Sequence, residues 1–196
     1  MNGMKASTPH ITFSCTKSFV GLLALIAIEE GYVSGTTTIV EILPKLEGSA
    51  YAGATFGYLL DMTVSLDFNE IYDDPYGDIQ AYSAALGATS QATGIQGPSV
   101  YDYVRGLSPD TTRSHGQVFE FQTPQTDVLN WAVSRLLKQD FIEALENRIW
   151  SKMGAGEDAY VLLDAFTNCC AGGGMNATAR DLARFASVML SDGKSG

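Results

Sequence analysis

Basic residues are scarce in this chain, and they nowhere form a run. The 196 residues include 12 Lys and Arg against 22 Asp and Glu, which gives a formal net charge of −10 at pH 7. Nucleic acids and anionic lipids bind surfaces on which positive charge is clustered, so an acidic surface of this kind repels them. We therefore expect no nucleic-acid partner.

Cysteines and long apolar runs are also limited. The three cysteines, Cys15, Cys169 and Cys170, include two neighbours that would strain a mutual disulfide, and their spacing lacks the pairs of a zinc site. The apolar run Phe19–Ile28 is too short to span a bilayer, and two glutamates follow it instead of a small-residue cleavage site. We expect a buried helix there and no membrane span in this chain. The sequence leaves the cellular location open.

What the chain does contain is ordinary globular composition, with 45% hydrophobic and 17% charged residues. Helical periodicity dominates, and only residues 159–163 read as a strand. Pro124 at a first helical position, after Thr123 as cap, marks one helix start, and Thr178 with Asp181 has the spacing of a capping box. The predicted helices are 15–30, 37–43, 54–62, 79–86, 99–107, 124–137, 140–150 and 178–190, and residues 68–78 read as a loop.

A Ser-x-x-Lys motif, Ser14-Cys15-Thr16-Lys17, stands at the start of the most apolar helix. A serine in the first turn lies in the positive field of the helix N-terminus, and a lysine one turn along lies on the same face. Burial would lower the pKa of the lysine, so that its neutral amine could accept the serine proton. On the tetrad alone, a serine helix cap beside a solvated lysine is the better interpretation.

Further blocks follow in order along the chain. They are Leu60-Asp-Met-Thr63, Glu70-Ile-Tyr-Asp-Asp-Pro75, Phe119-Glu-Phe-Gln-Thr-Pro-Gln-Thr-Asp-Val-Leu129, Arg148-Ile-Trp150, Gly172-Gly-Gly174 and Ala179-Arg-Asp-Leu-Ala-Arg-Phe185. With these blocks and Phe13-Ser-Cys-Thr-Lys-Ser-Phe19, the sequence resembles the β-lactamase-like (penicillin-recognising) serine hydrolases. The resemblance is strongest to the branch of 6-aminohexanoate-dimer hydrolases and related carboxylesterases, and it runs from about residue 10 to the end.

The resemblance implies an α/β (α+β) fold of the β-lactamase/transpeptidase type. Its antiparallel sheet takes strands from both chain ends, and its third motif, which supplies one oxyanion-hole donor, would lie beyond Gly196. We therefore expect residues 1–196 to form a single domain, incomplete at both ends. It should be a helix-rich portion from which most of the sheet is missing, and which leaves the apolar helix partly exposed.

The resemblance also implies a small-molecule amide or ester substrate, an acyl-enzyme on Ser14 assisted by Lys17, and neither cofactor nor metal. Tyr72, Phe121 and Gly173 are the candidate substrate-binding residues, although Gly173 could equally belong to a plain chain reversal. Phe121 stands where the family has a tyrosine, and its phenyl ring cannot exchange a proton. Three alternatives stay open: a weakened hydrolase relying on Lys17, a base from elsewhere with Tyr72 as candidate, or a non-catalytic homologue that binds a ligand or partner.

Overall fold

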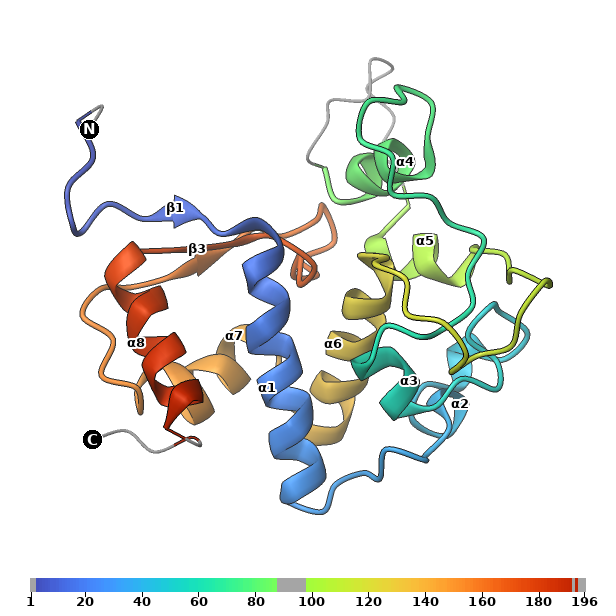
Figure 1. Ribbon diagram of the computed structural model, residues 1–196, viewed down its shortest axis with the longest axis horizontal. Coiled ribbons are helices and arrows are strands. Elements are labelled where there is room, and N and C mark those ends of the chain that lie inside the picture. Colours follow the sequence, from blue (N-terminus) through green and yellow to red (C-terminus); the bar gives the residue numbers. More distant parts are fainter. Residues whose placement is uncertain (1–2, 88–97, 192, 194–196) are drawn as a thin grey trace.

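Two long helices form the centre of the molecule. In the computed structural model, which describes residues 3–87, 98–191 and 193, α1 (Thr16–Glu29) and α6 (Pro124–Leu137) pack side by side (Figure 1). Both helices match the predicted segments to within one residue at either end. The apolar composition of α1 follows from this central place, since helices contact it on several sides.

The expectation that α1 would be left partly exposed is wrong for three of its large apolar side chains, whereas Leu22 and Ile26 are half-buried. Phe19, Val20 and Leu23 are fully buried, and the Phe19 ring stacks on Phe185 of α8 (Ala179–Leu190) with the ring centroids 3.9 Å apart. Leu25, by contrast, is 48% exposed. Burying each large apolar side chain contributes about 1.5–3 kcal/mol, so the helices alone supply a substantial core.

Shorter helices surround the central pair. They are α2 (Ile39–Ile42), α3 (Phe56–Leu60), α4 (Asp78–Ala85), α5 (Val100–Arg105) and α7 (Phe141–Leu145), with 3₁₀ turns at Phe13–Cys15 and Pro44–Leu46. Each of these α-helices overlaps a predicted helix, but the predicted helix 140–150 is not one α-helix, because Glu146–Trp150 is π-helical. The predicted cap at Thr178 is confirmed, since its side chain accepts from the Asp181 N–H. Thr123 takes the predicted N-cap position of α6, but its side chain makes no capping bond, because its hydroxyl donates to Glu70 instead.

The described residues contain a small antiparallel sheet of three short strands. Its order is β1 (His10–Ile11), β3 (Met175–Ala177), β2 (Tyr160–Val161), so the central strand is the last in the chain. The fold is therefore helix-rich, as expected, and β2 lies within the predicted strand 159–163. Because β1 ends just before Ser14 and β3 begins just after Gly174, their pairing brings the triple glycine beside the Ser-x-x-Lys turn.

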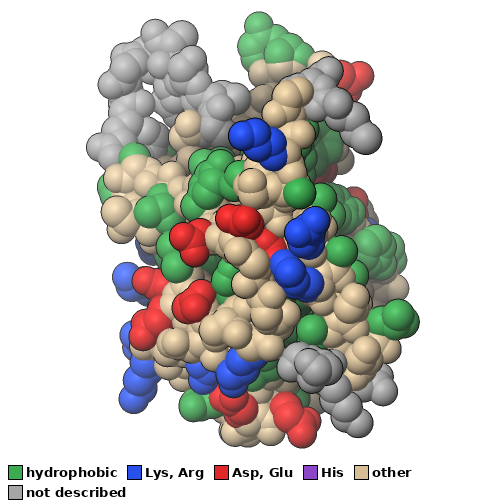
Figure 2. Space-filling view, turned by 90° about the vertical axis from the view of Figure 1, so that its left-hand side faces the viewer, with side chains coloured by type: hydrophobic (Ala, Val, Ile, Leu, Met, Phe, Trp, Pro, Cys, Tyr) green, Lys and Arg blue, Asp and Glu red, His purple; other side chains and the backbone are tan. Residues whose placement is uncertain are grey.

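The surface that carries α8 and the N-terminal strand is shown in Figure 2, where acidic and basic side chains are interspersed. Part of this charge is structural: Asp181 accepts hydrogen bonds from the Gly156 N–H at 2.8 Å and from Arg184 at 2.5 Å, and so fixes α8 to the preceding loop. Among the described residues, the helices are all too short or too polar to cross a membrane.

Candidate active site

The Ser-x-x-Lys turn brings its two reactive atoms together. Ser14 lies in the 3₁₀ turn that leads into α1, and Lys17 is in the first turn of that helix. The Lys17 Nζ lies 2.9 Å from the Ser14 Oγ, which is hydrogen-bonding distance. An ammonium donates along this contact, whereas a neutral amine can accept the serine proton along it. A solvated lysine, the alternative that the tetrad left open, does not describe this geometry.

Two further groups surround the Lys17 amine. The Gly172 carbonyl oxygen lies 2.5 Å from Nζ, and the Phe121 ring centroid lies 4.8 Å from it. Burial lowers the pKa of Lys17 below its ordinary value, and the carboxylates of Glu70 and Asp127 act in the opposite direction. Burial thus favours the neutral amine that a base needs, and the Gly172 carbonyl and the Phe121 ring can still stabilise the ammonium.

The backbone just before the nucleophile is strained. Phe13 has a φ of +46°, a left-handed value that is unusual for a bulky side chain. The Thr12 N–H donates to the Met175 carbonyl of β3 at 2.8 Å, and the Cys15 N–H donates to the Thr12 carbonyl at 3.1 Å. These bonds hold the sharp turn on which Ser14 sits, and strained turns of this kind concentrate at functional sites.

Ser14 lines a cavity of about 350 Å³. Ser14, Tyr72 and Gly173 all line it, so the structure places these three predicted site residues together. Phe121 is outside this lining and instead faces the Lys17 amine. The lining residues are Ile11, Phe13, Ser14, Tyr72, Ile79, Tyr82, Ser83, Leu86, Gly87, Thr123, Leu162, Leu163, Cys170 and Gly172–Gly174. In the part of the chain that the structure describes, none of these side chains is charged.

Tyr72 is held by a carboxylate beside the cavity. Its hydroxyl donates to Glu70, and burial together with this contact raises the pKa of Tyr72 to about 12. Glu70 in turn accepts from the Thr123 N–H and the Thr123 hydroxyl, both at 2.8 Å, at the start of α6. A negative charge is favourable at that helix end. Tyr72 therefore keeps its proton near neutral pH, which suits a hydrogen-bond donor and not a base.

Asp127 and Tyr82 are the two site residues that the sequence did not reveal. Asp127 is fully buried on α6, where its carboxylate accepts from the Tyr82 hydroxyl at 2.5 Å and from the Gly172 N–H at 3.2 Å. Burial raises the pKa of Asp127 to about 6, and the Tyr82 hydrogen bond and the Lys17 charge counteract that effect. The available signal was a carboxylate in the predicted helix 124–137, next to the apolar Val128 and Leu129.

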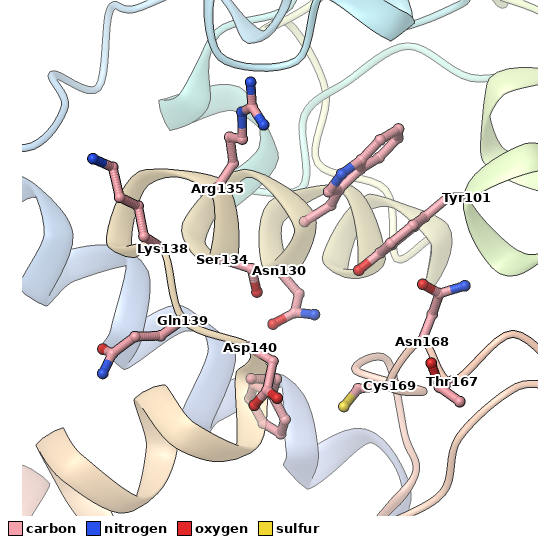
Figure 3. Close-up of a pocket in the computed structure, with 12 residues that line it drawn as sticks. Tyr101, Asn130, Ser134, Arg135, Lys138, Gln139, Asp140, Thr167, Asn168 and Cys169 are labelled. Carbon is pink, nitrogen blue, oxygen red and sulfur yellow. The ribbon is translucent and has the colours of Figure 1, made fainter.

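A second cavity, of about 380 Å³, lies farther along α6 (Figure 3). Tyr101 stacks on Trp131 at its wall, with the ring centroids 4.4 Å apart, and Asn130 faces it from the middle of the helix. Thr167, Asn168 and Cys169 line it, and the next residues of the same loop line the Ser14 cavity. None of the predicted site residues belongs to this cavity.

Carboxylates in and beside the acidic loop that precedes α4 accept hydrogen bonds from backbone N–H groups of the same loop. The Asp78 carboxylate accepts from the Asn69 N–H at 2.9 Å, and the Asp74 carboxylate accepts from the Tyr76 N–H at 3.0 Å. Within residues 3–87, 98–191 and 193, no three His, Cys, Asp or Glu side chains come together in a way that could hold a metal ion.

Comparison with known proteins shows which relatives the chain resembles. The chain is 34% identical over 193 residues to the 6-aminohexanoate-dimer hydrolase of Paenarthrobacter ureafaciens. The aligned region takes in 97% of this chain but 48% of that protein, so the chain spans about half the length of this relative.

Solved structures give the same result. The "Putative 6-aminohexanoate-dimer hydrolase from Bacillus anthracis" superposes with a TM-score of 0.88 at 29% identity, over 99% of this chain and 50% of that one. A D-alanine carboxypeptidase from Burkholderia cenocepacia shares the fold, with a TM-score of 0.65 at 19% identity over 94% of this chain and 50% of its own. The Beta-lactamase family model matches residues 2–196. The chain belongs to the β-lactamase family and has the β-lactamase/transpeptidase-like fold, in a helix-rich portion about half as long as these relatives.

Proposed function

We propose that this chain belongs to a serine hydrolase that cleaves a small-molecule amide or ester through an acyl-enzyme on Ser14. The observation that carries the proposal is the 2.9 Å contact between the Lys17 Nζ and the Ser14 Oγ, made by a lysine whose pKa burial lowers. A serine hydroxyl is a weak nucleophile until an adjacent base removes its proton. Lys17 is the group in contact that can do so.

The proton moves along this contact. The neutral Lys17 amine takes the proton of the Ser14 hydroxyl as Oγ bonds to the substrate carbonyl carbon. The Gly172 carbonyl and the face of the Phe121 ring stabilise the ammonium that forms, through a hydrogen bond and a cation–π contact. The ammonium then returns the proton to the leaving alcohol or amine, and water hydrolyses the acyl-enzyme. The Ser14 N–H would support the negative carbonyl oxygen of the tetrahedral intermediate.

The cavity beside Ser14 indicates the kind of substrate. Its wall combines Ile79, Leu86, Leu162 and Leu163 with hydroxyl groups and without a charged side chain among the described residues. An uncharged aliphatic acyl group fits such a wall, because burying an unpaired charge there is costly. The proposed substrate class therefore comprises aliphatic amides and aliphatic esters with an uncharged acyl group. We further propose that residues 1–196 form one domain, since a single apolar core joins the helices and the sheet.

The pH dependence of ester hydrolysis tests the role of Lys17. The rate of p-nitrophenyl butyrate hydrolysis is expected to rise with pH through an apparent pKa below the ordinary lysine value of 10.5, because burial favours the neutral amine. Lys17→Arg is the matched control, since arginine keeps the positive charge but does not act as a base. It should lose the rising limb together with most of the rate. An unchanged profile in Lys17→Arg would remove Lys17 from the proton transfer.

Phe121 allows a gain-of-function test. Phe121→Tyr places a phenol beside the Lys17 amine. We expect the ester hydrolysis rate to rise by at least about tenfold, which is a minimum, since a general acid or base usually contributes about 10²–10⁴-fold. The initial rate at saturating ester gives the answer. Phe119→Tyr, at a neighbouring exposed phenylalanine, is the control and should change nothing. If Phe121→Tyr keeps the wild-type fold by circular dichroism but shows no gain, the missing phenol is not what limits turnover.

Phe121 also favours a second candidate function, a homologue that binds a ligand in the Ser14 cavity without turning it over. The two functions differ in a simple measurement. A binding protein would hold an ester such as p-nitrophenyl butyrate intact, whereas the proposed hydrolase releases p-nitrophenol from it. The retained contact between Ser14 and Lys17 supports the hydrolase.

A further inference from the structure

The Asp127 carboxylate lies under the active-site lysine, shielded from solvent. The Asp127 side chain is fully buried. It belongs to α6, far along the chain from the segment that carries Ser14 and Lys17. A buried carboxylate is costly to maintain unless its hydrogen bonds and charge are used. The proton transfer from Ser14 to Lys17 does not require it as a reactant. Its place therefore calls for another explanation.

A single residue, Gly172, connects Asp127 to Lys17 through its two backbone groups. The Gly172 N–H donates to the Asp127 carboxylate at 3.2 Å, and the Gly172 carbonyl accepts from the Lys17 Nζ at 2.5 Å. The carboxylate thus holds the residue whose carbonyl oxygen accepts from the amine. Tyr82 fixes the carboxylate from the other side, with its hydroxyl 2.5 Å away.

Among the described groups that act electrostatically on Asp127, Lys17 carries the positive charge. Several titratable groups of the surrounding elements interact electrostatically with Asp127 or with its partner Tyr82. They are Tyr51, Glu70, Tyr82 of α4, Tyr101 of α5, Cys169 and Cys170. All of these are neutral or negative. Lys17 of α1 is the cation whose charge acts on the carboxylate, and the carboxylate acts in return on the lysine.

We infer that Asp127 is a positioning residue for the proposed hydrolysis: through the backbone of Gly172 and through its charge, it holds the Lys17 amine on Ser14 and stabilises the ammonium that forms when Ser14 is acylated. The inference rests on the proposed function. Ser14 loses its proton to Lys17, so one positive charge appears at Nζ in the transition state. A fixed negative charge nearby favours that state over the neutral amine that precedes it.

This role has a signature that a merely structural residue lacks. In Asp127→Asn the negative charge is gone, so the pKa of Lys17 should fall by about one unit, toward the value that burial and the remaining carboxylate of Glu70 set. The rising limb of the pH–rate profile then moves to lower pH. The plateau rate nevertheless falls by about tenfold, because a weaker base accepts the serine proton less readily. General damage to the site would lower the rate without moving the limb in this direction.

The experiment follows the Lys17 side chain directly. Protein labelled with ¹³C at the lysine ε carbon is titrated, and the Lys17 resonance is assigned by its loss in Lys17→Arg. The wild type, Asp127→Asn and Tyr82→Phe are compared, together with their pH–rate profiles for p-nitrophenyl butyrate. Tyr82→Phe removes a hydrogen bond but keeps the charge, so its Lys17 pKa should stay within a few tenths of the wild type. A Lys17 pKa that is the same in Asp127→Asn as in the wild type would overturn the inference.

Two readouts keep the outcomes separate. The wild-type Lys17 resonance should show a second, smaller inflection near pH 6, where Asp127 takes up its proton. That inflection tests the coupling even when Asp127→Asn does not fold, and its absence in the wild type contradicts the inference. A chain that shows the coupling but never hydrolyses the ester would refute the proposed function, and with it the catalytic part of the inference. The electrostatic link between the two side chains would still stand.

Discussion

Hydrolysis of p-nitrophenyl butyrate is expected to fall by at least about 10³-fold when Ser14 is replaced by alanine, because removing a nucleophile eliminates the covalent route altogether. The loss should appear in the maximal rate. The Ser14 cavity keeps its apolar walls in this variant, so the substrate still binds. Steady-state rates of the two purified proteins under the same conditions provide the measurement.

Ser18→Ala is the matched control for this substitution. Ser18 is exposed on α1, four residues beyond Ser14, and removing its hydroxyl should leave the rate within about twofold of the wild type, as for most surface substitutions. Comparable losses in both variants would show that the effect arises from damage to α1. A rate that survives in Ser14→Ala would mean that another group attacks the ester.

Gly172→Ala is expected to cause the other large effect, because the site leaves no space for a side chain there. An added Cβ would lie 2.3 Å from the Thr123 Cγ2 and 2.9 Å from the Tyr82 hydroxyl. The backbone must shift, and overpacking of this kind costs about 1–3 kcal/mol of unfolding free energy. The shift also moves the Gly172 carbonyl away from the Lys17 amine. We therefore expect a drop of at least about tenfold in ester hydrolysis beside the loss of stability.

Gly173→Ala separates this steric effect from the mere loss of a glycine. A Cβ at that position meets nothing closer than the Phe13 carbonyl carbon at 3.6 Å, which is an ordinary van der Waals contact. Urea unfolding should give Gly173→Ala a midpoint close to that of the wild type and Gly172→Ala a clearly lower one. Equal midpoints for the two variants would show that the glycine loop yields freely, and that it does not hold Lys17 in place.

The local part of this site could be predicted from the sequence. Ser14 and Lys17 are three residues apart where a 3₁₀ turn runs into α1, so local helical geometry brings them together, and the structure confirms the contact. The long helices were predicted for the same reason, since their apolar periodicity and the proline at position 124 act over a few residues. What can be read in this way depends on interactions between near neighbours in the chain.

The remaining contacts of the site and the small sheet depend on packing between segments that are far apart in the chain. Asp127 meets Tyr82 across 45 residues, and Lys17 meets Gly172 across 155, so no local pattern signals either contact. Thr123 was predicted as a helix cap because threonine before proline usually is one, but the carboxylate of Glu70 takes its hydroxyl. Strands β1 and β3 contain two and three residues, too few for an alternating pattern, and they exist only because they pair.

Mass spectrometry after exposure to a fluorophosphonate tests the central claim most directly, since the probe reacts with an activated serine and leaves a stable adduct. The account predicts one adduct per chain in the wild type, located on Ser14 by tandem mass spectrometry of its peptide, and none in Ser14→Ala. It also predicts slower labelling in Lys17→Arg, where the base is absent. An adduct on another residue, or equal labelling of the wild type and Ser14→Ala, would contradict the assignment of Ser14 as the nucleophile.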